Sequence, residues 1–590
     1  MTIVHLAWDF LRHRKGALAA ILGFQLVQIL LNLWLPSLNA RIIDVGIANQ
    51  DLPYIYRTGI EMLVATLVQI MCAMGAIYFG SRTAMQLGRH LRKQVFRHVQ
   101  GFSATDQHEF GAPTLVTRTT NDVTQVQMVV LLTFTVIVTS PIMGVGGIVM
   151  AIRQDPPLSL LLLIVVPVLG LIILLVMRAL TPRYSVQQKR IDRISTLLRE
   201  QLTGARVIRA FRRQGREQDR FAGANSDLRS IWLQIGMLWA FLMPATNVVV
   251  GASSAAVVWV GGHRIAEGAM MVGSLAAFIS YLMMILTAVM MTGMMAMLFP
   301  RGDVSATRIN QILDTKPSIS TPPDPRPLPA GALTFELASV SLTYPGAEVP
   351  VLEGISMRLD PGTTTAIIGS TGSGKSSLLR LFPRLIEASA GSVLAGGIDV
   401  RELDLTELRA RIAIIPQQAF LFSGTVASNV AGRLRVTDQI DRSRVERALR
   451  AAQAWDFVNS LDNGMDTQVE SGGKNLSGGQ RQRLTIARAL YRCLPDASGH
   501  RTADLLIFDD SFSALDFATD AALRLGLREA VGDVAILIVA QRVATIRQSD
   551  AILVLEAGQT AGIGTHEQLM ASCSTYQEIV SSQLSAEEAA

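Results

Sequence analysis

The chain has 590 residues, of which 49% are hydrophobic, with a mean hydropathy of +0.35 and a formal net charge of +6. So apolar a composition excludes an ordinary soluble protein and indicates membrane-spanning segments. The three cysteines, Cys72, Cys493 and Cys573, lie far apart and lack the spacing of a disulfide framework or a zinc site.

The first half contains six apolar segments, each long enough to cross a bilayer, which takes about 20 residues. The predicted spans are 17–38, 59–80, 129–152, 158–180, 235–260 and 272–299. The first apolar run is longer than the core of a signal peptide, so we expect it to be retained as a membrane span.

Two long polar segments separate the spans, one between the second and third and one between the fourth and fifth. They carry most of the basic residues of this half, such as Arg89 and Arg92 in the first and Arg206 and Arg209 in the second. The positive-inside rule therefore places both loops and both termini in the cytoplasm, so the charge requires no nucleic-acid partner. We expect the loops to continue the spanning helices into water and to join them by tight turns.

The sixth span is rich in methionine: Met283, Met284, Met290, Met291, Met294, Met295 and Met297. Flexible thioether side chains fill apolar cores but also form adaptable binding surfaces. The sequence leaves open whether these residues pack helices together or line a broad substrate path.

The composition changes after residue 310. A proline-rich stretch at 311–330 predicts an extended linker. From 331 to 590, short β-rich runs alternate with helical segments, as in a soluble α/β domain. The predicted organisation is a transmembrane domain at 1–310, a linker at 311–330 and an α/β domain at 331–590.

A phosphate-binding loop is predicted at the start of the α/β domain. Every fixed position of the pattern G-x-x-x-x-G-K-[ST] is filled by the run Gly369, Ser370, Thr371, Gly372, Ser373, Gly374, Lys375 and Ser376. An apolar run precedes this loop and a helix-like segment beginning with Ser377 follows, which is the strand–loop–helix context that the motif requires. Backbone amides of such a loop hold phosphate oxygens, the lysine reaches the terminal phosphates, and the serine hydroxyl binds Mg²⁺.

An apolar run at 505–508 ends in Asp509. An aspartate at the end of a strand that follows a phosphate-binding loop holds Mg²⁺ directly or through water. We therefore expect Ser376 and Asp509 to share one metal ion.

The most specific motif is the run Leu476, Ser477, Gly478, Gly479 and Gln480, which stands before a helix-like segment. With this motif the sequence resembles the ATP-binding cassette (ABC) transporters over nearly its whole length. In that family the signature loop of one nucleotide-binding domain covers ATP held by the opposing domain. A serine hydroxyl and glycine amides at a helix start suit that role.

The resemblance implies the exporter-type fold: a six-span α-helical transmembrane domain followed by an α/β nucleotide-binding domain, with two chains in the working transporter. It also implies ATP and Mg²⁺ as cofactors. Tyr344 resembles the residue that stacks on adenine, and Gln417 the glutamine that couples Mg²⁺ to the membrane domain. Residues 513–516 resemble the loop that crosses the dimer interface, while 110–118 and 200–211 resemble the family's coupling segments.

Two positions depart from the family pattern. The family has a glutamate after the Mg²⁺ aspartate, whereas this chain has Asp510, and a carboxylate misplaced by about 1 Å can cost about 10²-fold in rate. The family also has a switch histidine where this chain has Gln541, which can hydrogen-bond a phosphate but cannot become cationic. We expect this chain's own site to bind ATP but hydrolyse it poorly, while its signature completes an active site on a partner.

The resulting hypothesis is ATP-driven transport of a hydrophobic or amphipathic solute by one half of a heterodimer in the plasma (inner) membrane, with export favoured. Two alternatives stay open. One is an importer of siderophore or lipid built on the exporter fold, and the other is an ATP-regulated subunit that does not transport.

Overall fold

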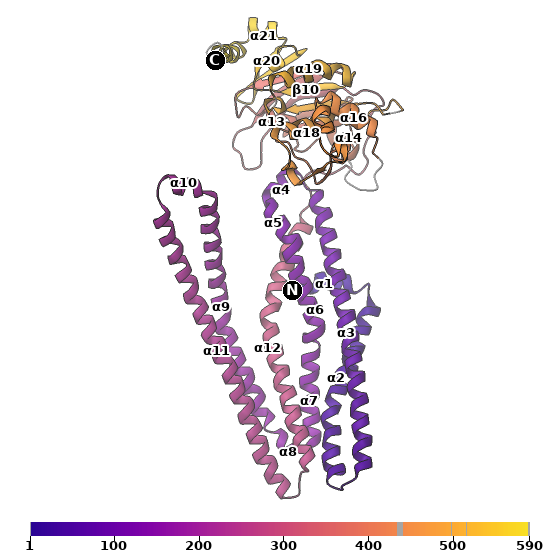
Figure 1. The fold of residues 1–590 in the computed structure, drawn as a ribbon, viewed down its shortest axis with the longest axis vertical. Coiled ribbons are helices and arrows are strands. Elements are labelled where there is room, and N and C mark those ends of the chain that lie inside the picture. The colour runs from indigo at the N-terminus through magenta and orange to yellow at the C-terminus, as the bar shows by residue number, and fades with distance from the viewer. Residues whose placement is uncertain (1, 433–439, 497, 515, 588–590) are drawn as a thin grey trace. The chain divides into compact units, whose positions relative to one another are not determined.

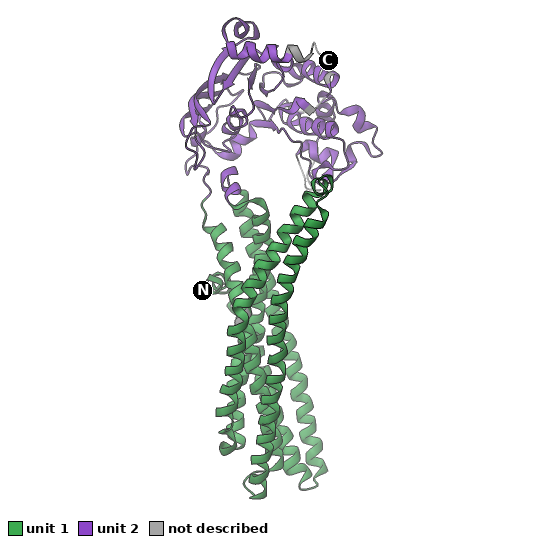
Figure 2. Cartoon of the chain, turned by 90° about the vertical axis from the view of Figure 1, so that its left-hand side faces the viewer, with its two compact units in different colours: residues 1–100, 110–316 green, residues 101–109, 317–590 purple. Residues whose placement is uncertain are grey.

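The computed structural model describes residues 2–432, 440–496, 498–514 and 516–587, and the chain forms two compact units (Figures 1 and 2). Unit 1 comprises residues 1–100 and 110–316, and unit 2 comprises 101–109 and 317–590. The sequence alone groups residues 101–109 with the transmembrane domain, whereas in the structure they cluster with the C-terminal half.

Unit 1 is built from long helices. Their bounds are α1 (Thr2–Leu11), α2 (Lys15–Arg41), α3 (Leu52–Gln100), α5 (Ala112–Thr117), α6 (Val123–Leu132), α7 (Thr139–Gln154), α8 (Pro156–Ser159), α9 (Leu162–Thr203), α10 (Ala205–Ala210), α11 (Gln214–Ala266) and α12 (Val272–Asp314). Three π-helical turns, η1 (Ile42–Ile47), η2 (Arg118–Asp122) and η3 (Thr133–Ile137), adjoin α2, α6 and α7.

Six continuous helices among the described residues are long and apolar enough to cross a membrane. Each of the six predicted spans lies inside one of them, so the six-span prediction is confirmed. The 53 residues of α11 correspond to about 80 Å at 1.5 Å per residue, against about 30 Å for the hydrocarbon core of a bilayer. The helices therefore continue well into water, and α9 and α11 run side by side to the short helix α10 (Figure 1).

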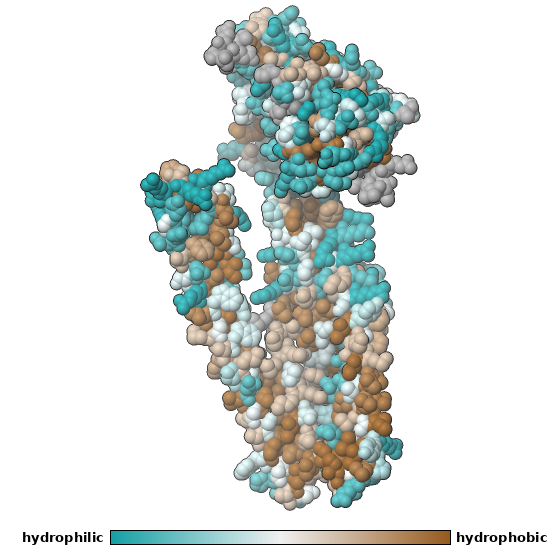
Figure 3. Space-filling model, in the orientation of Figure 1, coloured by the Kyte–Doolittle hydropathy of each residue, from teal (hydrophilic) through white to brown (hydrophobic). Residues whose placement is uncertain are grey.

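The surface of unit 1 separates apolar and polar zones along the helices. Side chains such as Leu163 and Leu174 are 72% and 63% exposed, which suits a lipid-facing surface. Hydrophilic side chains gather around α10 at the far end of the α9–α11 pair (Figure 3). Of the methionines in α12, Met284 and Met290 pack against the helical core whereas Met283 is exposed. The side chain of Met297 lies outside the described part of the chain.

Unit 2 contains two main sheets. The larger has the order β12-β11-β3-β10-β9-β6, formed by β3 (Thr364–Gly369), β6 (Ile412–Ile415), β9 (Leu505–Asp509), β10 (Ala535–Val539), β11 (Ala551–Glu556) and β12 (Gln559–Gly564). Its strands pair in parallel except for β11 with β12. The second sheet is antiparallel, with the order β2-β1-β4-β5, formed by β1 (Phe335–Leu342), β2 (Leu352–Leu359), β4 (Ala390–Ala395) and β5 (Ile398–Asp399). Two short strands, β7 (Gly424–Thr425) and β8 (Gln468–Val469), form a further pair.

Unit 2 also contains helices. They are α4 (Ala104–Phe110, whose last residue falls in unit 1), α13 (Lys375–Leu381), α14 (Leu405–Ala410), α15 (Val426–Ala431), α16 (Arg442–Ala451), α17 (Trp455–Asn459), α18 (Gly478–Cys493), α19 (Phe517–Val531), α20 (Val543–Ile546), α21 (His566–Ser572) and α22 (Ser574–Glu587). Short 3₁₀ turns lie at η4 (Val400–Glu402), η5 (Gly464–Asp466), η6 (Ser471–Gly473) and η7 (Ser511–Ala514).

The strands of the larger sheet other than the exposed edge strand β12 are buried on both faces, which explains their nearly continuous apolar sequences. Along β9, Leu506 and Phe508 join one hydrophobic cluster while Leu505 and Ile507 join the other. This alternation follows from the two-residue period of a strand. Because β3, β10 and β9 are parallel neighbours, the segments that follow them meet at one edge of the sheet.

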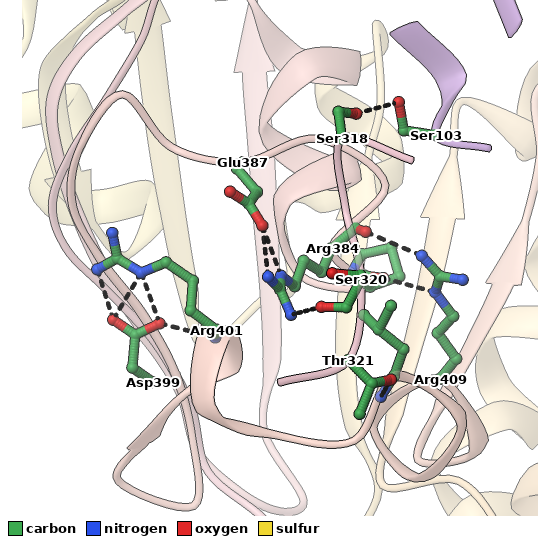
Figure 4. A network of polar contacts seen from close by, with 11 residues as sticks. Ser103, Ser318, Ser320, Thr321, Arg384, Glu387, Asp399, Arg401 and Arg409 are labelled. Atoms are coloured by element: carbon green, nitrogen blue, oxygen red, sulfur yellow. Dashed lines mark hydrogen bonds and ion pairs between the residues drawn. The ribbon is translucent and has the colours of Figure 1, made fainter. Parts of the chain in front are cut away.

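Helix α12 runs to Asp314, into the predicted linker, and from Ser318 on the linker is fastened within unit 2 (Figure 4). The hydroxyls of Ser318 and Ser103 lie 2.8 Å apart, and the Ser318 amide donates to Asp106 at 3.0 Å. Burial acts to raise the pKa of Asp106, but hydrogen bonds from Ser103 and Ser318 outweigh it and hold the pKa below its usual value. The carbonyl of Ser320, two residues after Ser318, accepts from the Arg384 guanidinium at 3.2 Å. Residues 101–109 and the core of unit 2 are thus joined through the linker.

Candidate active site

The predicted phosphate-binding loop lies between β3 and α13, so the structure brings residues 369–377 together in one turn. Gly374 has a φ of +97°, and a Cβ there would lie 2.6 Å from the Leu352 side chain and 2.9 Å from the Val351 carbonyl oxygen. Only glycine fits such a place without strain. Gly372 is also left-handed, with a φ of +87°. Such residues are typical of backbone nests, in which successive N–H groups face an anion.

Lys375 folds over this loop. Its Nζ donates to the carbonyl oxygens of Gly369 at 2.7 Å and Ser370 at 2.8 Å. Burial lowers the pKa of Lys375, and the charges of Asp510 and Asp509 oppose that shift. A partly buried ammonium held by two backbone carbonyls and the Ser373 hydroxyl fits a loop whose natural ligand is an anionic phosphate chain.

The predicted metal residues meet at the end of β9. Ser376 Oγ donates to Asp509 Oδ1 at 3.5 Å, and burial together with the neighbouring charge of Asp510 raises the pKa of Asp509. A hydroxyl and a carboxylate are hard oxygen donors that suit Mg²⁺. The described residues contain no group of three or more His, Cys, Asp or Glu side chains that could hold a metal. That fits Mg²⁺, which takes its remaining ligands from phosphate oxygens and water.

Asp510 is the most constrained side chain of the site. Its Oδ2 accepts from Gln541 Nε2 at 2.8 Å and from Gln417 Nε2 at 3.3 Å. Its backbone has a φ of +49°, which is uncommon outside glycine and clusters at functional sites. Burial raises the pKa of Asp510, although the two amides oppose the shift. The structure therefore places both predicted catalytic residues, Asp510 and Gln541, in direct contact.

The sheet order explains why these three side chains meet. Gln417 follows β6, Asp510 follows β9 and Gln541 follows β10, and these strands are consecutive neighbours in the sheet. Sequence reasoning assigned Gln417 to Mg²⁺ and Gln541 to phosphate, and missed that both amides bond the Asp510 carboxylate. The signal that could have found this contact is the strand order.

Tyr344 lies beside the helix that follows the phosphate-binding loop. Its hydroxyl and Ser377 Oγ are 3.0 Å apart. Its ring is partly buried against the hydrophobic cluster that contains Leu505 and Ile507. The structure thus brings Tyr344 next to the loop, where an aromatic ring offers a surface on which a base can stack.

The signature residues form the start of α18. Ser477 is its N-cap: Ser477 Oγ accepts from the Gln480 amide at 3.3 Å, and Gln480 Oε1 accepts from the Ser477 amide at 2.9 Å. This capping box leaves Gly478 exposed and Gly479 half-buried in the first turn. Among the described residues, no hydrogen bond joins the signature to the phosphate-binding loop of the same chain.

Part of the predicted loop at 513–516 cannot be placed, because Leu515 lies outside the described residues. Ser513 Oγ donates to the Asp510 carbonyl at 2.8 Å, and Asp516 caps α19 by accepting from the Thr519 amide at 2.9 Å. The two ends of this loop are therefore attached to the active site and to α19.

Comparison with known proteins gives consistent matches along the chain. Residues 18–289 match the family described as "ABC transporter transmembrane region", and residues 352–510 match the family described as "ABC transporter". The chain is 45% identical to an uncharacterised ABC transporter ATP-binding protein of Mycobacterium tuberculosis over 97% of both chains.

Two further relatives carry functional names. The chain is 30% identical to an ATP-dependent lipid A-core flippase of Chromobacterium violaceum, over 93% of this chain and 91% of the flippase. It is 31% identical to a multidrug efflux ATP-binding/permease protein of Mycobacterium tuberculosis, of which it covers 46%. Among solved structures, a bacterial Atm1-family ABC exporter with ATP bound matches 97% of the chain with a TM-score of 0.78 at 23% identity, which shows the same fold.

Proposed function

The chain belongs to the ATP-binding cassette transporters, and on that basis we propose that it is one half of a heterodimeric exporter whose own ATP site turns over slowly. Its transmembrane and ATP-binding regions make it an exporter-type transporter, and the ATP-binding domain implies ATPase activity. The finer proposal rests on one observation: both amides that surround Asp510 bond the same carboxylate oxygen.

A general base must offer a free oxygen within hydrogen-bond reach of the attacking water. In this site Gln417 and Gln541 hold the Asp510 carboxylate in place through Oδ2, but the side chain is one methylene shorter than glutamate. The raised pKa of Asp510 would in itself suit a base, because it brings the pKa nearer the working pH. The deficit therefore lies in the reach of the carboxylate rather than in its basicity.

Gln541 also lacks the positive charge that a histidine at this position could supply during hydrolysis. A glutamine amide donates a neutral hydrogen bond and never becomes cationic. Loss of a single stabilising donor or charge at a developing anion typically costs about 10²- to 10³-fold in rate. The phosphate-binding loop keeps every residue needed to hold ATP, so binding without rapid turnover follows. Mg²⁺, held by Ser376 and Asp509, would supply charge neutralisation at the terminal phosphates when bound.

The signature is proposed to serve a second chain. Ser477 and Gln480 form an intact capping box, and Gly478 is exposed at a helix start, where amides attract phosphate. An intact signature beside a weakened catalytic pair is useful only if the two halves of the assembly differ.

A second chain also fits the surface of the second long loop. Leu202, Val207 and Phe211 are 79%, 60% and 73% exposed around α10, in a segment otherwise rich in arginine. Apolar side chains grouped at the tip of a polar loop mark an interaction surface. The multidrug efflux relative is long enough to hold two such units in one chain, since this chain covers 46% of it.

The proposed substrate is a hydrophobic or amphipathic solute. Relatives named as a lipid A-core flippase and as a multidrug efflux protein support this class. Exposed methionines of α12, such as Met283, Met291 and Met294, would add an adaptable apolar surface. The distribution of basic residues supports a plasma-membrane topology with both termini and the ATP-binding unit in the cytoplasm.

The test is site-specific nucleotide trapping in the full-length protein purified with any co-purifying half-transporter. A photoreactive ATP analogue should label both chains in the absence of turnover. With vanadate, which traps the product of hydrolysis, label should concentrate on the partner. A preparation that contains only copies of this chain and traps nucleotide on it efficiently would refute the proposal.

A further inference from the structure

The backbone on both sides of Gln541 is held by one side chain of the C-terminal helix α22. Gln583 Oε1 accepts from the Val543 amide at 2.8 Å, and Gln583 Nε2 donates to the Gln541 carbonyl at 2.7 Å. The segment between these two bonds carries the amide that donates to Asp510 at 2.8 Å. Gln583 therefore lies one hydrogen bond away from the backbone that orients the catalytic pair.

Helix α22 is firmly attached where it carries Gln583. Tyr576 is fully buried and Val580 is 8% exposed, both within the hydrophobic cluster on one face of the larger sheet. The Tyr576 hydroxyl also lies 2.9 Å from His566 Nδ1. Positions 576, 580 and 583 have the spacing of one helix face, so the half-buried Gln583 lies on the face that carries the buried Tyr576 and Val580.

The far end of the same segment is held by α19. Arg524 donates to the Ala544 carbonyl at 3.0 Å and pairs with Asp520 at 3.0 Å. Asp520, Gln583 and Asp510 line one cavity of about 480 Å³. The segment from 541 to 545 is thus fixed from two helices beside the catalytic carboxylate.

We propose that Gln583 is a positioning residue for this chain's ATP site: it holds the 541–543 backbone so that Gln541 and Asp510 keep their relative placement. The inference rests on the proposed assignment of Asp510 and Gln541 to ATP turnover, but it does not require a second chain. Without the two hydrogen bonds of Gln583, the Gln541 side chain can leave Asp510. The phosphate-binding loop, which binds ATP, is unaffected.

The competing account is that Gln583 only satisfies the hydrogen-bonding needs of a buried turn. Its loss would then lower stability without a selective effect on turnover. A matched control separates the two, because Gln577 lies on the same helix and its Nε2 donates to the Met570 carbonyl at 2.6 Å, in a helix-to-helix contact.

The experiment compares Q583M, Q583E and Q577M in the full-length protein in lipid nanodiscs, with the ATP site of any co-purifying partner silenced. Single-turnover hydrolysis of radiolabelled ATP measures even a slow site. The dissociation constant of a fluorescent ATP analogue and amide hydrogen exchange across 540–547 are measured in the same preparations.

In Q583M we expect the hydrolysis rate constant to fall about tenfold, as a displacement of well under 1 Å at a catalytic group allows, and exchange at 540–547 to rise. The nucleotide dissociation constant should stay within about twofold of the wild-type value, because the phosphate-binding loop binds ATP independently of turnover. Q583E keeps the acceptor for the Val543 amide and should be intermediate, while Q577M should match wild type.

The proposal that Gln583 positions Gln541 would be overturned by a Q583M hydrolysis rate constant within about twofold of wild type. An equal fall of the rate constant in Q577M would also overturn it. If the wild-type chain alone hydrolyses ATP briskly, the heterodimer proposal fails. The ratio of the Q583M and Q577M hydrolysis rate constants would still decide whether Gln583 positions residues 541–543.

Discussion

Restoring the family's catalytic pair should accelerate hydrolysis at this chain's own site. The perturbation is Asp510→Glu together with Gln541→His. In the structure the Asp510 carboxylate is held at 2.8 Å by Gln541 and at 3.3 Å by Gln417. Glutamate adds one carbon–carbon bond, about 1.5 Å, and would carry the carboxylate past these amides. Histidine at 541 adds a side chain that ionises near neutral pH.

The expected gain follows from the reach of the carboxylate. A displacement of about 1 Å at a catalytic group is worth about 10²-fold, or about 2.7 kcal/mol at about 1.4 kcal/mol per tenfold change. Part of this is offset because the longer side chain must give up the bond from Gln417, which is fitted to Asp510. We therefore expect turnover at this site to rise between about 10-fold and 100-fold.

The assay is single-turnover ATP hydrolysis by the full-length protein in nanodiscs, with the partner's phosphate-binding lysine changed to alanine. The single substitutions show whether reach or charge dominates. Adding Lys375→Ala to the double variant must abolish the gain, because Lys375 belongs to the same site. An unchanged rate in a double variant that still binds ATP would show that the weakness lies elsewhere.

Three further predictions concern the same unit. Asp510→Asn should raise the apparent melting temperature at neutral pH, because burial favours an uncharged side chain at this position. Burial raises the folded-state pKa of Asp510, so the folded state binds its proton more tightly and loses stability as pH rises through that pKa; the advantage of asparagine should therefore shrink as pH falls toward 3.8. Ser477→Ala should cost about 1 kcal/mol in thermal or denaturant unfolding through loss of the helix cap, and should lower ATPase activity of the pair more than Ser477→Thr, which keeps the hydroxyl. Equal activity in these two variants would contradict a role for the hydroxyl in the partner's site. Tyr344→Phe loses only the bond to Ser377 and should leave ATP affinity nearly unchanged. Tyr344→Ala should weaken ATP affinity at least about 5-fold, as loss of about 1–3 kcal/mol of stacking requires, and titration with a fluorescent ATP analogue distinguishes the two variants.

The fold could be predicted well from local patterns. Apolar runs of the right length predicted the six spanning helices, because burial of backbone hydrogen bonds in lipid permits little else. The phosphate-binding loop was found for a similar reason: Gly372 and Gly374 occupy left-handed positions that other residues adopt only with strain.

The contacts made across the sequence could not be predicted in the same way. The meeting of Gln417 and Gln541 on Asp510 depends on the order β6-β9-β10, which is a property of the sheet and not of any one segment. Likewise, Gln583 lies far from Gln541 along the chain, and a polar residue at the end of an amphipathic helix has no local mark of function. The grouping of residues 101–109 with unit 2 depends on three hydrogen-bonding side chains, Ser103, Asp106 and Ser318, whose residue types are common in any loop.

The fastened linker has a consequence for how related chains can diverge. The Arg326 amide donates to the Glu402 carbonyl at 2.8 Å, so the stretch from Ser318 to Arg326 is tied at both ends. Loss or gain of one residue between these ties would shift one end by about 3.3 Å, more than a hydrogen bond tolerates. Insertions and deletions in this stretch should therefore be rare among related chains.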